Sequence, residues 1–180
     1  MKLFASLFVL QFALSTTFSL ASSKSIPDSS VPDCLTQDHL IIPVNNEQVI
    51  QWKNSTENQF ASRGHVSGII SELVPDRNGH THFGIIIVSE VDGKRSDSIE
   101  IIYNTSFGKL QGVAVNAHVE ACGDYITSNQ DTAQYPASPF GALVHWVHLS
   151  KNPETGHVSG YVAINGVLFG TDPAGFGSRP

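Results

Sequence analysis

Short apolar runs separated by tight-turn sequences constrain this chain more than any other feature. Asn78-Gly79 and Asn165-Gly166 are dipeptides that favour two-residue hairpin turns, because both positions tolerate positive φ. Asp92-Gly93 and the segment 152–156 supply further turns. The apolar residues between these turns lack the sustained spacing of three and four residues that an amphipathic helix needs. The sequence therefore predicts short strands joined mainly by hairpins.

The expected strands fit a small closed β structure. We expect strands over 49–52, 65–73, 82–88, 98–103, 123–127, 142–149, 158–164 and 167–169. In the second of these, Val66, Ile69 and Leu73 are expected to face the core. The unbroken apolar run 85–88 predicts burial on both faces or a barrel wall beneath a covering loop. A short helix is suggested only within 113–120. The prediction is an all-β fold, a small OB-like barrel of five to seven mostly antiparallel strands, with a sandwich as the alternative.

The N-terminal segment has the features of a secretory signal. Lys2 precedes an apolar run of roughly a dozen residues, which is too short for a permanent membrane span. Small residues at Ser19 and Ala21 fit a signal peptidase site, so we expect a signal peptide over 1–21; a buried N-terminal helix is the alternative. The expected organisation continues with a flexible leader over 22–33, a single β-barrel domain over 34–170 and an irregular tail over 171–180. We therefore expect a secreted protein, periplasmic or extracellular, without a membrane span.

The two cysteines agree with export, because thiols form stable disulfides mainly in oxidising compartments. A bond between Cys34 and Cys122 would close a loop of roughly 90 residues and stabilise the fold by about 4 to 5 kcal/mol. Two separate buried thiols are the alternative. Asn54 and Asn104 each begin a triplet that matches the N-glycosylation pattern.

The charge balance argues against nucleic acid as a partner. The chain has 16 Asp and Glu residues against 10 Lys and Arg residues, a net charge of -6, whereas phosphate-backbone binders carry the opposite excess. Gly-x-Ser-x-Gly, Cys-x-x-Cys, His-Glu-x-x-His and Walker motifs are absent from the sequence. Four scattered carboxylates are expected to be solvated surface groups: Glu72, Asp76, Glu100 and Asp124. No catalytic residue follows from these patterns.

Histidines supply the one concentration of chemistry. The chain contains eight, and six of them flank or lie within the expected strands. His80 and His82 are two residues apart, so on a strand both rings point to one face. His145 and His148 are three apart, so a bulge or a strand end must turn one ring before both reach one site. His157 follows a turn that would return it beside His148.

These five residues form the predicted metal site. Zinc, or another divalent metal that prefers imidazole, is the expected cofactor, held by His82, His148 and His157 with His145 or His80 in addition. Three neutral imidazoles leave one open position on a tetrahedral ion. The alternative is that the imidazoles are surface groups or only satisfy buried hydrogen bonds, in a structural or interaction protein without a small ligand.

An aromatic binding face is a further alternative. Trp146, Tyr161 and Tyr103, together with Trp52, would stack on an oligosaccharide or a peptide if the barrel placed them on one face.

The chain also resembles a known family over roughly 64–170. The matching segments are 73–83, 123–124, 144–148, 156–157, 160–161 and 165–166. They are similar to a small exported bacterial family known as domain of unknown function 3465. The resemblance implies an OB-like barrel and export, and it singles out His82, His145, Trp146, His148 and His157. This chain departs from the family pattern at 149–151, where members often have Asp-Pro, and at Tyr161, where members have Trp. A further family ligand is thereby lost, and the resemblance supplies no established activity.

Overall fold

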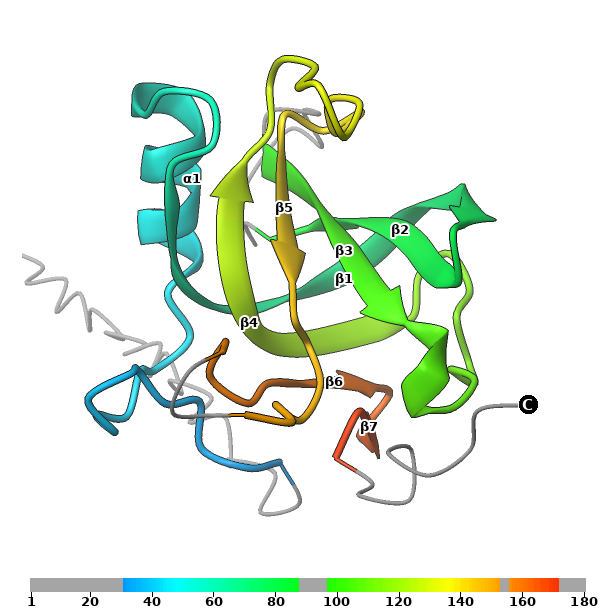
Figure 1. Ribbon diagram of the computed structural model, residues 1–180. Helices are drawn as coiled ribbons and strands as arrows, with labels where there is room; N and C mark the ends of the chain where they lie inside the picture. Colours follow the sequence, from blue (N-terminus) through cyan, green and yellow to red (C-terminus); the bar gives the residue numbers. More distant parts are fainter. Residues whose placement is uncertain (1–30, 88–96, 153–155, 172–180) are drawn as a thin grey trace, which may run out of the picture.

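The computed structural model describes residues 31–87, 97–152 and 156–171 (Figure 1). The expected signal peptide, most of the expected leader and tail, and the expected turn at 92–93 lie outside the described residues. The elements are α1 (Asn46–Ser55), β1 (Ala61–Arg77), β2 (His80–Ile86), β3 (Ser98–Asn104), η2 (Thr105–Phe107), β4 (His118–Thr127), β5 (Ala142–His145), β6 (Tyr161–Ile164) and β7 (Val167–Phe169).

Five of the strands close into a barrel, as the sequence predicts. The sheet order is β1-β2-β3-β5-β4-β6-β7, and an additional pairing of β1 with β4 closes the first five strands into a ring. Only β3 and β5 pair in parallel; the other pairs are antiparallel. Figure 1 shows β6 and β7 extending the wall at one end of the barrel, with α1 packed beside β1 and β4. The fold is an all-β, OB-like barrel.

The two Asn-Gly hairpins form where the sequence predicts them. Asn78 and Gly79 have φ values of 52° and 73°, and they connect β1 to β2. Asn165 and Gly166 have φ values of 48° and 79°, and they connect β6 to β7. Positive φ at both central residues matches the twist of the flanking strands, so each turn fixes the register of its hairpin.

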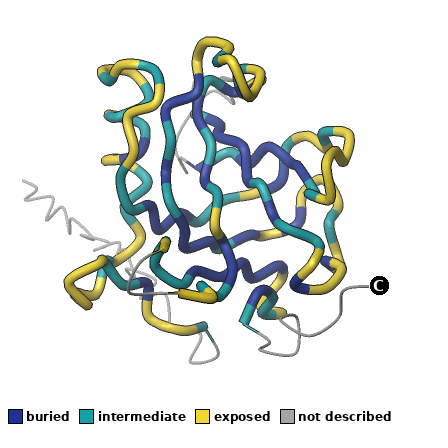
Figure 2. The backbone as a smooth tube through the Cα atoms, viewed as in Figure 1, coloured by how far each residue is buried: buried dark blue, intermediate teal, exposed yellow. Residues whose placement is uncertain are grey.

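Alternate residues of each strand fill the barrel. Ile101 of β3 pairs with Phe83 of β2 and with Val144 of β5, and all three are fully buried in one core cluster. Tyr125 of β4 pairs with Val144 and closes the same layer. Figure 2 shows the buried stretches running along the barrel wall, with exposed residues gathered at the loops.

The outer face of β2, β3 and β5 is buried as well, over part of its length. Glu100 is the register partner of Gly84, and it lies on the opposite face of β3 from the core residue Ile101. Glu100 is nevertheless 0% exposed. Phe140, from the segment between β4 and β5, packs so closely over Gly84 that a Cβ there would lie 2.1 Å from the ring. This covering segment explains why β2 is buried on both faces from His82 to Ile85; in the predicted run 85–88, Ile86 is only half-buried and Val88 lies outside the described residues.

The one α-helix lies where the sequence predicts a strand. The expected strand Val49–Trp52 is instead part of α1, and the helix expected within 113–120 is absent, because β4 already begins at His118. Val49 is the one fully buried residue of α1, and Ile50 and Trp52 pack against the core while only partly buried. The position of the helix depends on polar contacts: Asn45 accepts a hydrogen bond from the backbone N–H of His65, and Asn46 accepts one from that of Ser67.

The buried side of β1 also differs from the prediction. Val66 is buried as expected, but Ile69 and Leu73 are 39% and 51% exposed, and Ile70 is fully buried in their place. β1 pairs with β4 through Ile69 and with β2 from Ile69 onward, and its register shifts between Ile70 and Glu72. Side chains alternate along a strand, so Ile69, three residues after Val66, faces the opposite side, whereas Ile70 faces the same side as Val66.

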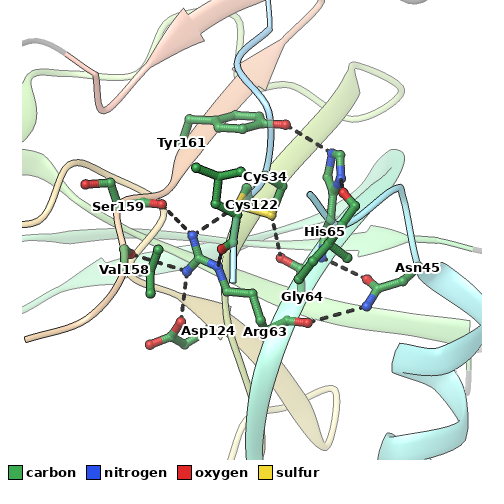
Figure 3. The surroundings of a disulfide bond; sticks show 12 residues. Cys34, Asn45, Arg63, Gly64, His65, Cys122, Asp124, Val158, Ser159 and Tyr161 are labelled. Atoms are coloured by element: carbon green, nitrogen blue, oxygen red, sulfur yellow. Dashed lines mark hydrogen bonds and ion pairs between the residues drawn. A yellow bond between two sulfur atoms is a disulfide. The ribbon is translucent and has the colours of Figure 1, made fainter. Parts of the chain in front are cut away.

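A disulfide links the N-terminal arm to the barrel. Cys34 and Cys122 are bonded, which confirms the predicted pairing, and the alternative of two separate thiols is wrong. Figure 3 shows the Arg63 guanidinium beside the bond; it contacts the Cys122 sulfur at 3.1 Å and Asp124 Oδ1 at 2.8 Å. Burial lowers the pKa of Arg63, and the neighbouring Asp124 carboxylate opposes that effect. Arg63 Nε also donates to the Leu35 carbonyl, which fixes the arm against β1.

Candidate functional site

Five histidines come together on the outside of the barrel. This histidine cluster consists of His80, His82, His145, His148 and His157. Ring centroids of its members lie 6.3 Å apart for His80 and His82, 5.3 Å for His80 and His145, and 5.0 Å for His148 and His157. Trp146 stacks on both His145, at 4.6 Å, and His157, at 4.5 Å. Every histidine singled out in the sequence therefore belongs to one continuous group of rings.

The strand pairing places three of the rings on one face. His82 pairs with Ile102, which lies on the side of β3 away from the core, and His80 is two residues from His82 on β2. β3 in turn pairs in parallel with β5, where Val144 faces the core and His145 faces outward. The rings of His80 and His145 thus meet across the outer surface of β3.

Trp146 brings the other rings to the same place. Its φ is 56°, so β5 ends there and the chain turns. His145 and His148 would face opposite sides of a regular strand, but both contact the Trp146 ring after this turn. Gly160 packs against the turn, and a Cβ on it would lie 2.4 Å from the Trp146 carbonyl oxygen. The strand end supplies the change of direction that the three-residue spacing requires.

His157 returns beside His148 because the two segments hydrogen bond to each other. The Gly160 N–H donates to the His148 carbonyl at 2.8 Å, and the Ser150 N–H donates to Ser159 Oγ at 3.0 Å. The rings of His148 and His157 meet edge to face at an interplanar angle of 87°. The sequence predicts this proximity from the turn over 152–156, of which residues 153–155 lie outside the described ranges.

Backbone carbonyls determine which ring nitrogen carries the proton in three of the imidazoles. Nδ1 of His80 lies 2.9 Å from the Asn78 carbonyl, Nδ1 of His148 lies 2.8 Å from that of Leu149, and Nδ1 of His157 lies 3.0 Å from that of Val158. A carbonyl oxygen only accepts, so each Nδ1 carries the proton. A neutral imidazole of this tautomer has its lone pair on Nε2.

His82 is oriented by a buried carboxylate instead. Its Nδ1 lies 2.7 Å from Glu100 Oε1, and the two side chains are 4% and 0% exposed. Arg77 approaches the same carboxylate oxygen at 3.8 Å, and Glu100 Oε2 has no hydrogen-bond partner. In metal sites, a carboxylate commonly accepts a hydrogen bond from the second ring nitrogen of a metal-bound histidine and so fixes the orientation of that ring. Glu100 is placed to do the same for His82.

Sequence reasoning missed Glu100. It was expected to be a solvated surface group, and that expectation is wrong, because the residue is fully buried. The flanking Ile99 and Ile101 indicate a strand whose alternate side chains face the core, which leaves Glu100 on the outer face. Nothing in the sequence indicates that Phe140 and its segment cover that face.

Two imidazole nitrogens in the cluster are buried and have no hydrogen-bond partner. They are Nε2 of His145 and Nε2 of His148. Burial, together with the smaller effect of the other four histidines of the cluster, lowers the pKa of His145 to about 3. Burial likewise lowers the pKa of His148 to about 4, against the effect of its hydrogen bond to the Leu149 carbonyl. Both rings are neutral near pH 7, as metal ligation requires.

The contacts within the cluster are pairwise. Among residues 31–87, 97–152 and 156–171, no three His, Cys, Asp or Glu side chains converge as a complete metal centre. Two imidazoles that share a tetrahedral zinc ion have ring centres about 5 Å apart, because each nitrogen lies about 2 Å from the metal and about 1 Å in front of its ring centre. The pairs His80–His145 and His148–His157 have this spacing.

The expected aromatic face does not form. Tyr103 is fully buried and its hydroxyl donates to the Phe107 carbonyl, while Tyr161 is 2% exposed. Trp52, a residue of α1, packs against Tyr125 of β4. Trp146, at 37% exposure, is the one member of the expected set with a substantial accessible surface, and its ring stacks on histidines.

Tyr161 belongs to a second buried polar group. Its hydroxyl lies 3.0 Å from both His65 Nε2 and Glu120 Oε1, and the remaining nitrogen of His65 lies 2.7 Å from the Ile42 carbonyl. Burial and the nearby Glu120 carboxylate raise the pKa of Tyr161. Every polar atom named here has a partner, so this group holds the N-terminal arm to the barrel.

Comparisons of this chain with protein-family models, with curated proteins and with solved structures find no match. The likeness to domain of unknown function 3465 therefore stays a prediction. In the described part of the chain, no helix has the length and apolar character needed to cross a membrane.

Proposed function

We propose that this chain is an exported β-barrel protein that binds a divalent metal ion, such as zinc, through the histidine cluster. The buried, unpartnered Nε2 atoms of His145 and His148 are the main support for this proposal. A polar atom that is removed from water without a new partner costs free energy, by about 1 to 3 kcal/mol. A bound metal ion would remove that cost, because it takes the lone pair that no protein donor uses.

The first ion is assigned to His80 and His145, with His82 as the nearest further imidazole. The 5.3 Å separation of the first two rings suits a shared ion, and Nε2 is the atom that each can offer. Glu100 behind His82 would raise the basicity of that ring and hold its orientation. A modest movement of His82 toward the pair would supply the third nitrogen.

Export is supported by two independent features. The N-terminal 21 residues have the pattern of a signal peptide. The Cys34–Cys122 disulfide is of a kind that persists in an oxidising compartment.

Metal analysis of the disulfide-bonded protein, purified without a histidine tag, tests this proposal. We expect stoichiometric zinc to be retained after dialysis, and we expect the melting temperature to rise on addition of zinc to chelator-treated protein. His145→Gln should remove the zinc held by His80 and His145 and reduce the rise in melting temperature. His118→Gln is the matched control, because His118 is exposed and its Nε2 contacts Ser67 outside the cluster. Absence of retained metal together with absence of a thermal shift would refute the proposal.

A structural protein without a small ligand is less well supported. In such a protein the cluster histidines would serve to satisfy buried hydrogen bonds, yet two of their nitrogens have none. Replacement of His148 by Gln would then change stability and nothing else, and neither the wild-type protein nor the variant would retain zinc, so the same metal analysis distinguishes the two functions.

A further inference from the structure

The histidine cluster is divided into two halves by one indole ring. His80 contacts both His82 and His145 on the first side. His148 and His157 contact each other on the second side. Trp146 stacks on one imidazole from each half, and within the described residues no direct contact between imidazoles joins the halves. The cluster therefore has two places where a pair of imidazoles could hold an ion.

We propose that the protein binds two divalent metal ions, the second of them between His148 and His157. This inference rests on the proposed function of the cluster and adds a second site to it. The rings lie 5.0 Å apart, which is about the spacing of two imidazoles on one tetrahedral ion. Both Nδ1 protons are donated to backbone carbonyls, so both rings offer Nε2.

His148 is held in position for this role. Its ring stacks on Phe107 at 3.8 Å with an interplanar angle of 18°, and Phe107 belongs to the barrel core. One face of the ring and its Nδ1 are therefore occupied. His148 is 3% exposed, and its Nε2 is buried without a hydrogen-bond partner. This nitrogen is the free polar atom around which a second ion would bind.

The second site should be the weaker one. It offers two imidazoles, so water must complete the coordination of the ion. Lys151 places a positive charge near His148, which opposes the binding of a cation. Imidazole pairs favour borderline divalent metals such as zinc and copper over magnesium or calcium. We therefore expect zinc to bind in two steps, one at each site, and magnesium to bind at neither site.

Isothermal titration of the metal-free, disulfide-bonded protein with zinc tests the second site. The wild-type protein should take up two ions in resolved steps. His157→Gln should remove the weaker step and leave the tighter one, whereas His80→Gln should weaken the tighter step and leave the other. His118→Gln should retain both. Circular dichroism spectra must be unchanged in each variant. His157 tolerates replacement because it is only half-buried and lies beyond the barrel strands.

The outcomes separate the second site from the proposed function. Uptake of one ion by the wild-type protein would overturn the second site and leave metal binding intact. Loss of both steps in a folded His157→Gln protein would also overturn it, because the histidines would then form one centre. Uptake of no ion would refute both proposals. If His157→Gln fails to fold, Lys151→Glu provides the second test: the weaker step should become tighter, and an unchanged affinity would contradict the assigned position.

Discussion

Reduction of the Cys34–Cys122 bond is predicted to lower the free energy of unfolding by several kcal/mol. The two cysteines are 88 residues apart in the sequence. Closing a loop of that length removes chain entropy from the unfolded state, which is worth about 4.6 kcal/mol near room temperature. The folded state should change little, because other contacts also hold the arm. Arg63 Nε donates to the Leu35 carbonyl, and His65 Nδ1 contacts that of Ile42.

Urea unfolding followed by circular dichroism measures this effect. The oxidised protein is compared with the protein in a phosphine reductant and with Cys34→Ala/Cys122→Ala. Reduction should lower the urea concentration at the midpoint of unfolding. It should also make the free energy of unfolding fall more steeply with urea concentration, because the unlinked unfolded chain exposes more surface. The double variant should be insensitive to the reductant. A loss of less than about 1 kcal/mol would refute the reasoning, since the entropy of a loop this long predicts several times that value.

Three further predictions follow from individual residues. The pKa of His148 falls from an ordinary 6.5 to about 4 on folding, so the unfolded chain binds the proton first. In chelator-treated protein, His148 should therefore account for a loss of about 3 kcal/mol of stability as the pH drops from about 6.5 to about 4, and His148→Phe should remove that part of the pH dependence in urea unfolding. Gly160→Ala should cost about 1 to 3 kcal/mol, because its Cβ would lie 2.2 Å from the Cys122 carbonyl oxygen; an unchanged melting temperature would show that the loop adjusts freely. Glu100→Gln should weaken the tighter zinc step about 10- to 100-fold by removing the carboxylate behind His82, and unchanged affinity in a folded variant would exclude that role.

Local sequence determines the hairpins of this barrel. Asn-Gly at 78–79 and 165–166 adopts positive φ whatever surrounds it, so the turns and the strands next to them could be predicted. α1 could not, because its only buried residue is Val49 and its docking depends on Asn45 and Asn46 meeting β1. Contacts between segments that are distant in the sequence override a weak local preference.

The histidine cluster could be predicted in its membership but not in its layout. Strand periodicity places His80 and His82 on one face, and turn placement returns His157 beside His148. Two features depend on the tertiary fold. One is the positive φ of Trp146, which turns the chain so that the rings on either side of it join the same group. The other is the cover that buries Glu100 beneath Phe140.

The central claim is that the histidine Nε2 atoms are unprotonated and available to a metal. Long-range ¹H–¹⁵N correlation spectra of the imidazole rings, recorded on the disulfide-bonded protein with and without zinc, measure this directly. His148 and His157 should show the tautomer with the proton on Nδ1 when metal is absent, and their Nε2 resonances should shift when zinc is added. Protons on Nε2 in the metal-free protein, or Nε2 resonances that do not respond to zinc, would contradict the account.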